Sequence, residues 1–183
     1  MKKLITLLLP LLMSVACSQP KEPIDLKELN EKEISPNNFE YFTKDTSEPY
    51  SGDVYSIEKR KSFNTNYMKK WEGKLVDGRK HGTWYKYSYE EDSLTSSQEW
   101  PFQNGNVNGV IKSYNYSPEK TLWIETNMKD GEEYGLQIMY YSNGQKAWEE
   151  FREGEYGQVT RWRKSYNENG SLESVSGDTT LKQ

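Results

Sequence analysis

The chain of 183 residues has only one cysteine and one histidine. A single cysteine rules out a disulfide within the chain. The single histidine, His81, is more typical of a solvated turn than of a metal ligand or a catalytic base, because a metal site needs three or four converging ligands. We therefore expect no disulfide scaffold, no metal site and no Ser/His/Asp catalysis.

Aliphatic residues are also scarce. Leu, Ile, Val and Phe together make up about 18% of the chain, a level typical of disorder. The 14 Tyr and 6 Trp argue against disorder, because aromatic side chains bury large areas and Tyr tolerates a half-exposed position. Strand-like runs rich in Tyr, Trp and Thr predict an all-β protein with a thin sheet rather than a thick core.

Catalytic and cofactor-binding motifs are missing as well. No glycine-rich phosphate loop leads from a strand into a helix, and no calcium-binding loop occurs. Adjacent carboxylates stand at Glu90–Asp92, Glu132–Glu133 and Glu149–Glu150. Neighbouring residues of a strand point to opposite faces, so we interpret these groups as solubilising charge rather than as a glycosidase pair. The sequence therefore predicts a non-enzymatic protein without a cofactor.

Residues 1–16 differ from the rest of the chain. Lys2 and Lys3 precede an apolar run over 4–16, which is the layout of a secretory signal peptide and is too short for a membrane-spanning helix. Cys17 follows directly. It could be a free thiol, or it could lie just past an ordinary cleavage site after Ala16. A lone cysteine at this position favours a third reading, lipidation, and residues 14–17 resemble a bacterial lipobox, with Ser14 in place of the usual Leu.

Lipidation at Cys17 predicts a protein that is anchored in the cell envelope and faces the periplasm or the cell exterior. Without Lys2 and Lys3 the net charge changes from −4 to about −6. A chain this acidic is a poor partner for nucleic acid. It also gains nothing from an anionic lipid surface, so the lipid must provide the anchor.

Residues 17–38 are expected to form the lipidated N-terminus and a tether. Pro20 and Pro23 favour an extended linker, and the apolar spacing that could form a short helix before Pro36 is weak. The pattern changes from residue 39. We expect a repeat domain over 39–176 and a tail over 177–183.

Two series of turn signals alternate along the repeat domain. The first recurs at a nearly constant spacing and consists of Asp77-Gly78, Asn104-Gly105, Asp130-Gly131 and Glu153-Gly154. The second ends at evenly spaced positions and consists of Glu91-Asp92, Ser117-Pro118, Asn143-Gly144 and Asn169-Gly170. Asn-Gly and Asp-Gly between strand-like runs predict hairpins whose turns need positive φ. The two series predict an elongated single-layer antiparallel sheet of tandem hairpins, with one series at each edge.

The strand residues keep the same period as the second turn series. Trp84, Val110, Leu136 and Trp162 recur at this interval, and residues four positions further on repeat in the same way. Equal parity within each strand predicts one shared face. The candidate binding surface is an aromatic–lysine face made of Trp84, Lys86, Lys112, Tyr114, Tyr140, Trp162, Lys164 and Tyr166. The alternative is that these rings and lysine stems form only the sheet's own packing.

The stretch WEGKLVDGRKHGTW at 71–84 resembles a MORN repeat, and PYSGDVY at 49–55 resembles the opening half of another. The units KDGEEYGLQIMYYSNG at 129–144 and REGEYGQVTRWRKSYNENG at 152–170 are similar to the bacterial variant of this repeat. The resemblance covers roughly residues 40–176. The sequence departs from the pattern at 60–66, where RKSFNTN replaces the tight turn, and at 90–97, where the turn glycine is missing.

The resemblance assigns structural roles to the glycines. Turn glycines supply positive φ, and the second glycine of a pair starts the returning strand, where an aromatic ring of a neighbouring repeat is expected to lie over a residue without Cβ. The turn glycines are Gly78, Gly105, Gly131, Gly144, Gly154 and Gly170, and the second glycines are Gly82, Gly109 and Gly135.

The family usually serves as an interaction module, so the resemblance implies a non-catalytic scaffold that binds an unknown envelope protein. A glycan or cell-wall ligand on the aromatic face is the second hypothesis. Some bacterial members are labelled antitoxin components, which implies antitoxin-like or immunity-like partner binding as a further alternative. That alternative fits poorly, because a signal peptide takes the product out of the cytoplasm.

Overall fold

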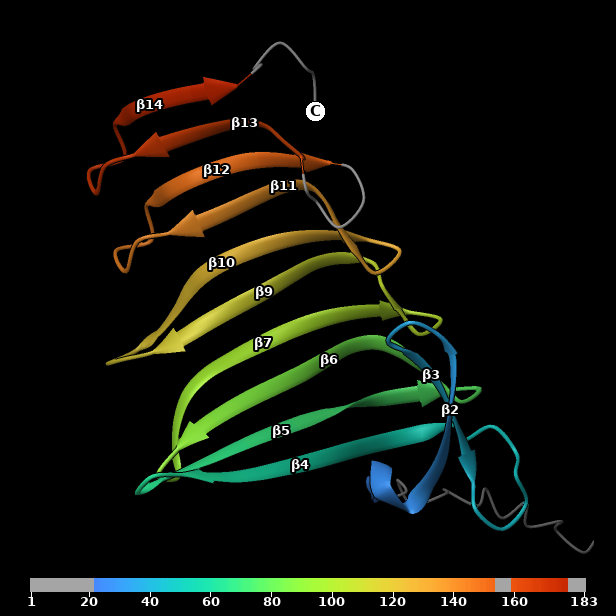
Figure 1. The fold of residues 1–183 in the computed structure, drawn as a ribbon. Helices are drawn as coiled ribbons and strands as arrows, with labels where there is room; N and C mark the ends of the chain where they lie inside the picture. The colour runs from blue at the N-terminus through green and yellow to red at the C-terminus, as the bar shows by residue number, and fades with distance from the viewer. Residues whose placement is uncertain (1–21, 154–158, 178–183) are drawn as a thin grey trace, which may run out of the picture.

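The computed structural model describes residues 22–153 and 159–177 (Figure 1). One 3-10 turn, η1 (Leu26–Glu28), is the only helical element of these two ranges. A long 12-stranded sheet contains most of the strands. In their order across it these are β1 (Ile24–Asp25), β4 (Gly52–Ser62), β5 (Thr65–Val76), β6 (Arg79–Glu90), β7 (Ser93–Gln103), β9 (Gly109–Tyr116), β10 (Lys120–Lys129), β11 (Glu132–Tyr140), β12 (Lys146–Glu153), β13 (Val159–Tyr166) and β14 (Leu172–Gly177), while β8 (Asn106–Val107) pairs with β7.

The predicted fold class is confirmed. From β4 to β14 the chain runs back and forth as consecutive antiparallel hairpins, so the sheet is elongated and, apart from the short β8, each strand pairs with its neighbours in sequence. The two series of turns lie at opposite ends of the strands, as Figure 1 shows. Asp77-Gly78, Asn104-Gly105 and Asp130-Gly131 all have positive φ at both turn residues, which is the conformation that Asn-Gly and Asp-Gly favour.

The first turn series also joins the repeats to one another. The amide of Gly78 donates to the carbonyl of Tyr50, and Gly105 and Gly131 donate in the same way to Lys80 and Val107. Each turn therefore bonds to the preceding unit, which links the hairpins at these ends of the strands in addition to their strand pairing.

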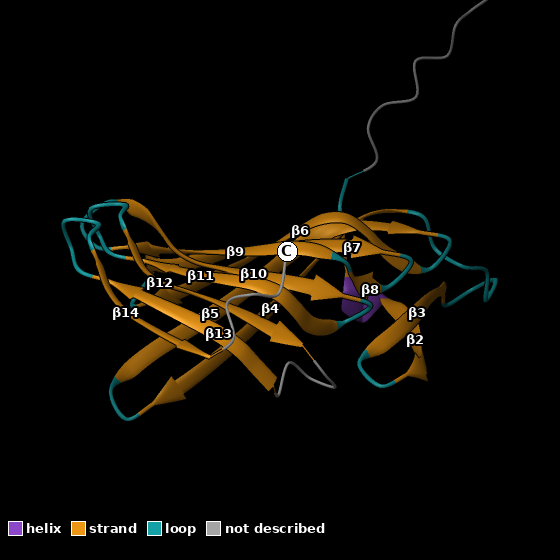
Figure 2. Ribbon diagram, turned by 90° about the horizontal axis from the view of Figure 1, so that it is seen from above, coloured by secondary structure: helices purple, strands orange, loops and turns teal. Residues whose placement is uncertain are grey.

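The N-terminal segment differs from the expected tether. From Ile24 onward it is part of the fold: β1 pairs in parallel with β4, and β2 (Leu29–Ser35) forms a separate two-stranded sheet with β3 (Asn38–Thr43). Figure 2 shows this hairpin on one side of the long sheet. The expectation of a tether was wrong for 24–38, because the few apolar residues in this segment cover the sheet beneath them. Residues 17–21 lie outside the described ranges.

The hairpin β2–β3 closes the main core. Leu29 and Tyr41 of the hairpin pack with Val54, Leu75 and Trp84 of the sheet, and the last two are fully buried. The indole Nε1 of Trp84 donates to the carbonyl of Lys74 at 3.1 Å, so burying this ring leaves no donor unpaired. The sheet is thus one layer thick along most of its length and two layers thick over β4–β6.

The two faces of the sheet follow from the strand register, because directly paired residues share a face. We call the side covered by β2–β3, which carries Trp84, the hairpin face. The opposite side, which carries Tyr85, is the open face. No other element of the described ranges covers the open face (Figure 2).

The register corrects the predicted aromatic–lysine face. Lys86 pairs with Gln98, which pairs with Ser113, so Lys112 and Tyr114 lie on the face opposite to Trp84 and Lys86. The predicted face assumed one constant period, but the step from Gly78 to Gly105 is one residue longer than the step from Gly105 to Gly131. A slip of one residue moves a side chain to the other face of a sheet.

The glycine roles need a second correction. Gly82 has no heavy atom within 4 Å of a built Cβ, Gly109 approaches only Pro101, and Gly135 approaches only Asn127. These glycines have positive φ but support no aromatic ring. The ring contact occurs instead at Gly73, where the indole of Trp84 occupies the space that a Cβ would need.

Four further expectations concern local segments. At 60–66 the strands β4 and β5 continue to Ser62 and Thr65, so a tight turn is retained although the residues differ from the repeat pattern. Phe63 stands in this turn with φ 53° and is almost fully exposed. Cys17, the signal peptide over 1–16 and the turn residue Gly154 lie outside the described residues.

Candidate binding face of the sheet

A row of directly paired residues crosses the open face from β4 to β14, and we call it the central row. Its second, fourth, sixth and eighth members are glutamates, and two further members are lysines. The row is Tyr55, Glu72, Tyr85, Glu99, Lys112, Glu125, Ile138, Glu149, Lys164 and Val175.

Each glutamate of the central row accepts a hydrogen bond from a tyrosine on the next strand. The phenol of Tyr87 donates to Glu72 at 3.1 Å, and Tyr140 donates to Glu125 at 2.8 Å. The other two pairs are Tyr114 with Glu99 and Tyr166 with Glu149, the last at 2.7 Å. We call these four tyrosines the tyrosine ladder. Every phenol reaches toward the preceding strand, which draws its ring across the sheet in the same direction.

Lysines complete the pattern around the glutamates. Lys70 lies 2.5 Å from Glu72, and Lys112 lies 3.9 Å from Glu125. Glu149, which is almost fully buried, contacts Lys146 at 2.6 Å and Lys164 at 3.5 Å. The face therefore carries closely paired charges of both signs instead of a field of one sign.

These contacts shift the pKa values of the groups that make them. Burial, together with the neighbouring carboxylate, raises the pKa of Tyr87, Tyr140 and Tyr166 to about 12. Burial also raises the pKa of Tyr114. Burial alone raises the pKa of Glu149, but the hydrogen bonds from Lys146 and Tyr166 outweigh it and lower that pKa. At neutral pH the four phenols therefore keep their protons and act as donors.

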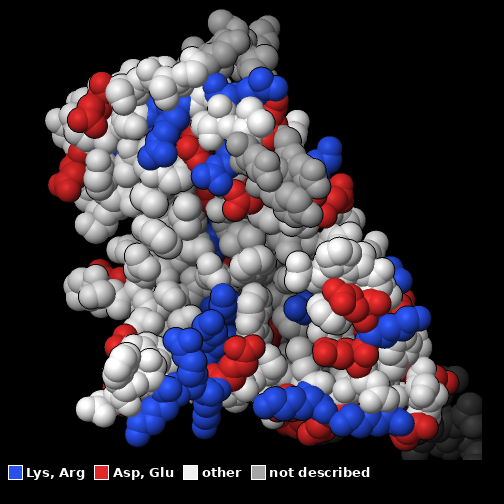
Figure 3. All heavy atoms as spheres, viewed as in Figure 1, with Lys and Arg blue, Asp and Glu red and all other residues white. Residues whose placement is uncertain are grey.

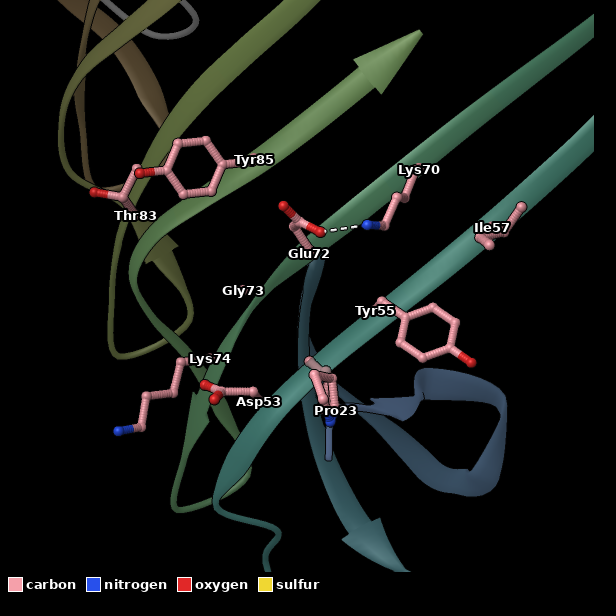
Figure 4. A pocket seen from close by; sticks show the side chains of 11 residues that line it. Pro23, Asp53, Tyr55, Ile57, Lys70, Glu72, Gly73, Lys74, Thr83 and Tyr85 are labelled. Carbon is pink, nitrogen blue, oxygen red and sulfur yellow. Dashed lines mark ion pairs between the residues drawn. The ribbon is translucent and has the colours of Figure 1, made fainter. Parts of the chain in front are cut away.

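A hollow of about 580 Å³ lies at the β4–β6 end of the central row. Its floor includes Gly73, and Figure 4 shows the rings of Tyr55 and Tyr85 on opposite sides of this glycine. Charged groups border the other two sides, with Glu72 and Lys70 on one and Asp53 and Lys74 on the other. The hollow lies at a register shift between Glu72 and Lys74, where the backbone of Gly73 forms part of its floor while the Cα position that lacks a Cβ faces Trp84 on the other side of the sheet.

The structure brings most of the predicted binding residues onto the open face. Tyr114, Tyr140 and Tyr166 belong to the tyrosine ladder, Lys112 and Lys164 belong to the central row, and Trp162 pairs with Phe151 on the same face. The other two differ. Trp84 is fully buried in the core, and Lys86 lies on the hairpin face with its ammonium 5.1 Å from the ring of Trp71.

Trp162 is also less accessible than predicted, because only 4% of it is exposed. Its ring stacks on Phe151 at a centroid distance of 6.5 Å, and the ammonium of Lys164 lies 5.0 Å from it. At this end of the sheet the alternative interpretation holds, since the ring and the lysine stem pack against the sheet itself.

Of the four glutamates in the central row, the sequence singled out only Glu149, as part of the pair Glu149–Glu150 that we interpreted as solubilising charge, and the other three were not predicted as site residues. A signal was present. In the first three pairs the tyrosine follows its glutamate at one constant spacing, at positions 72 and 87, 99 and 114, and 125 and 140. The predicted residues therefore identified the tyrosines but not the acidic groups to which they bond.

Charge is distributed unevenly over the surface. Figure 3 shows Lys and Arg side chains over the ends of β4 and β5 that meet at the turn beside Phe63. Lys59, Arg60 and Lys61 contribute to this cluster, and Asp92 lines the same shallow depression. Cationic residues on the outer strand of a sheet oppose pairing with further strands, so this cluster protects the edge at β4.

Two observations limit the kinds of site that the described residues hold. They include no group of three or more His, Cys, Asp or Glu side chains placed to hold a metal ion, and His81 is exposed. Within 22–153 and 159–177 no helix is long and apolar enough to cross a membrane.

Comparisons with protein-family models and with curated proteins find no match. One solved structure is similar in part: the crystal structure of a Staphylococcus aureus TarM mutant in complex with fondaparinux, alpha-GlcNAc-glycerol and UDP. The similarity covers 66% of this chain but 21% of the TarM chain, with 16% sequence identity and a TM-score of 0.27. A TM-score this low carries no conclusion about the fold or the function of this chain.

Proposed function

We propose that this chain is a non-catalytic scaffold of the cell envelope, built from MORN-type hairpins, and that its open face holds a second envelope component. The observation that carries the proposal is the tyrosine ladder, in which four pairs of hydrogen-bonded Tyr and Glu recur on successive hairpins. A surface on which each repeat presents the same groups is suited to binding an extended partner.

The chemistry of the glutamates supports binding rather than catalysis. A general acid needs a raised pKa, whereas the pKa of Glu149 is lowered. Glu72, Glu125 and Glu149 already accept hydrogen bonds from phenols and lie beside lysines. They lie on three different strands of one sheet face instead of converging on one point.

Photo-crosslinking in the native membrane tests the scaffold. A photoreactive amino acid at Tyr85, which is 39% exposed on the open face, should trap an envelope component. The matched control is the same amino acid at Tyr67, which pairs with Arg60 on the hairpin face and should trap nothing comparable. Equal trapping from both positions, or none from Tyr85, would contradict a binding role for the open face.

The anchor is tested separately. We propose that a lipid on Cys17 holds the chain at the membrane and that residues 1–16 are removed on export. The variant Cys17→Ala should then leave the membrane fraction and appear in soluble envelope extracts. If this variant stays in the membrane fraction to the same extent as the wild type, lipidation is not the anchor.

A further inference from the structure

We infer that the partner of the open face is an extended, β-linked polysaccharide that lies across the strands, with one two-sugar unit over each hairpin. This inference rests on the proposed function only in taking the open face as the binding surface. It names the chemical class of the partner from the period, the rings and the charges of that face.

The period is the first argument. Successive members of the tyrosine ladder are two strands apart, and neighbouring strands are separated by about 4.8 Å, so the ladder repeats about every 10 Å. In an extended β-(1→4)-linked chain alternate sugars are turned over, so the same sugar face recurs at every second unit. Two linked pyranose rings span a length close to this repeat, which allows the same contact on each hairpin.

The position of the rings is the second argument. Each phenol of the ladder is held by its glutamate across the sheet, so its ring is fixed before a ligand arrives. Tyr85 and Tyr87 lie nearly parallel, with an interplanar angle of 16° and centroids 6.4 Å apart. Flat rings fixed in this way offer the apolar face of a sugar a surface that costs little conformational entropy to use.

The composition of the central row is the third argument, because it favours a glycan over a protein as the partner of the open face. The centre of a protein–protein interface is depleted in charged residues. Charged residues make up six of the ten members of the central row, and they occur from Glu72 on β5 to Lys164 on β13 instead of surrounding an apolar patch. Hydroxyl groups both donate and accept hydrogen bonds, so a sugar can bond to Glu and Lys without leaving a charge unpaired.

The hollow provides the end of this path. Tyr55 and Tyr85 flank it, and Glu72, Lys70, Asp53 and Lys74 border it. Glu72 borders the hollow and also accepts the hydrogen bond from Tyr87 of the tyrosine ladder. A polysaccharide that starts between the rings of Tyr55 and Tyr85 therefore continues directly onto Tyr87. We therefore place a terminal sugar in the hollow and the following sugars along the ladder.

The experiment uses the chain from Cys17 onward, with Cys17→Ser to remove the anchor, and β-(1→4)-linked N-acetylglucosamine oligomers as probes. Calorimetric affinity should rise stepwise from the disaccharide to longer oligomers, because each added unit reaches another hairpin at high effective concentration. Purified peptidoglycan in a sedimentation assay provides a polymeric probe of the same linkage.

Variants locate the binding. Tyr114→Ala with Tyr140→Ala should weaken binding of the longest oligomer by about tenfold or more and flatten the dependence on length. The pair Tyr114→Phe with Tyr140→Phe keeps both rings and should bind within a few fold of the wild type. Tyr67→Ala on the hairpin face is the matched control and should bind like the wild type. Circular dichroism and thermal unfolding verify the fold of each variant.

The outcomes distinguish this inference from the function on which it rests. The proposal of a polysaccharide partner is overturned if the affinity does not depend on oligomer length, or if it survives the loss of both tyrosine rings in a folded variant. Absence of glycan binding, with a protein trapped at Tyr85 but not at Tyr67, overturns the polysaccharide and leaves the scaffold intact. Absence of glycan binding, with nothing trapped at Tyr85, overturns both.

Discussion

The phenol of Tyr140 on β11 donates a 2.8 Å hydrogen bond to the carboxylate of Glu125 on β10. The same relationship joins Tyr87 to Glu72 and Tyr166 to Glu149 on other hairpins. A repeated polar pair of this kind uses side chains that a thin sheet cannot bury completely. It joins neighbouring strands across the open face, and it fixes the tyrosine rings that we propose as the binding surface.

These pairs predict how stability changes at alkaline pH. The pKa of Tyr140 is about 12 in the folded chain, above its ordinary value of 10.0. Between these two values the unfolded chain has lost the proton that the folded chain keeps, so the stability from this pair is present below pH 10 and is lost as the pH rises toward 12. Denaturant unfolding at a series of alkaline pH values should show this loss.

The variant Tyr140→Phe isolates the pair. It keeps the ring but has no proton to lose, so its free energy of unfolding should fall less steeply over the same pH range. Absorbance titration of tyrosinate gives an independent measurement, in which the variant should lack one of the late-titrating groups. Identical slopes for variant and wild type would mean that the Tyr140–Glu125 pair does not exist in solution.

The contact between Trp84 and Gly73 predicts the effect of a single methyl group. In Gly73→Ala the new Cβ overlaps the indole of Trp84, which is fully buried and cannot move away. Overpacking of this kind costs about 1–3 kcal/mol of unfolding free energy, measured by denaturant titration. Because the overlap is specific to the indole, Gly73→Ala combined with Trp84→Phe should destabilise less than the sum of the two single changes.

Gly82→Ala is the matched control for Gly73→Ala. A Cβ at residue 82 meets no heavy atom within 4 Å, so its cost of about 1 kcal/mol comes only from the positive φ of 72°. This cost should not depend on the residue at 84. If the two glycine variants couple equally to Trp84→Phe, the ring does not rest on Gly73.

Turn chemistry made much of the fold predictable, because Asp-Gly and Asn-Gly constrain the backbone locally wherever they occur. Face assignment was harder. It depends on counting residues without a single error, and the one longer step, between Asp77 and Asn104, moved Trp84 to the face opposite Lys112. Counted from the second glycine of each pair, Trp84, Ile111 and Gln137 occupy the same position, and all three are buried.

The hairpin β2–β3 could not be predicted for a different physical reason. Its strands carry few apolar residues: Leu29 and Tyr41 are buried in the core, and Phe39 packs partly buried against them. A pattern this sparse is indistinguishable from a polar linker until the surface beneath it is known. The glutamates of the central row are similar, because an acidic residue in a strand reveals its partner only after the register is fixed.

Leu29 provides the test of whether this hairpin belongs to the fold. It is 8% exposed and packs in the same cluster as Trp84. Leu29→Ala should lower the free energy of unfolding by about 2–3 kcal/mol, because it leaves a cavity above the sheet. Ile34→Ala, on the same strand but 38% exposed, is the control and should stay within about 0.5 kcal/mol of the wild type. Equal stability of the two variants would indicate that the segment is a tether and does not pack on the sheet.

Glu149 gives the prediction at acidic pH. Its carboxylate is almost fully buried and contacts Lys146, Lys164 and the phenol of Tyr166. Replacing it in Glu149→Gln removes the negative charge between two lysines, and we expect a loss of about 1–2 kcal/mol at neutral pH. Glu119→Gln, in an exposed turn, is the matched control and should change little.

The dependence on pH shows that the charge of Glu149 is responsible. The pKa of Glu149 is lowered in the folded chain, so its contribution is present above its ordinary value of 4.5 and is lost as the pH falls through the lowered pKa. Once protonated, Glu149 resembles Gln, and the stabilities of wild type and variant should converge in acid. A difference that stays constant over this range would indicate a change in packing instead of the loss of a charge that orders the lysines and the last tyrosine of the ladder.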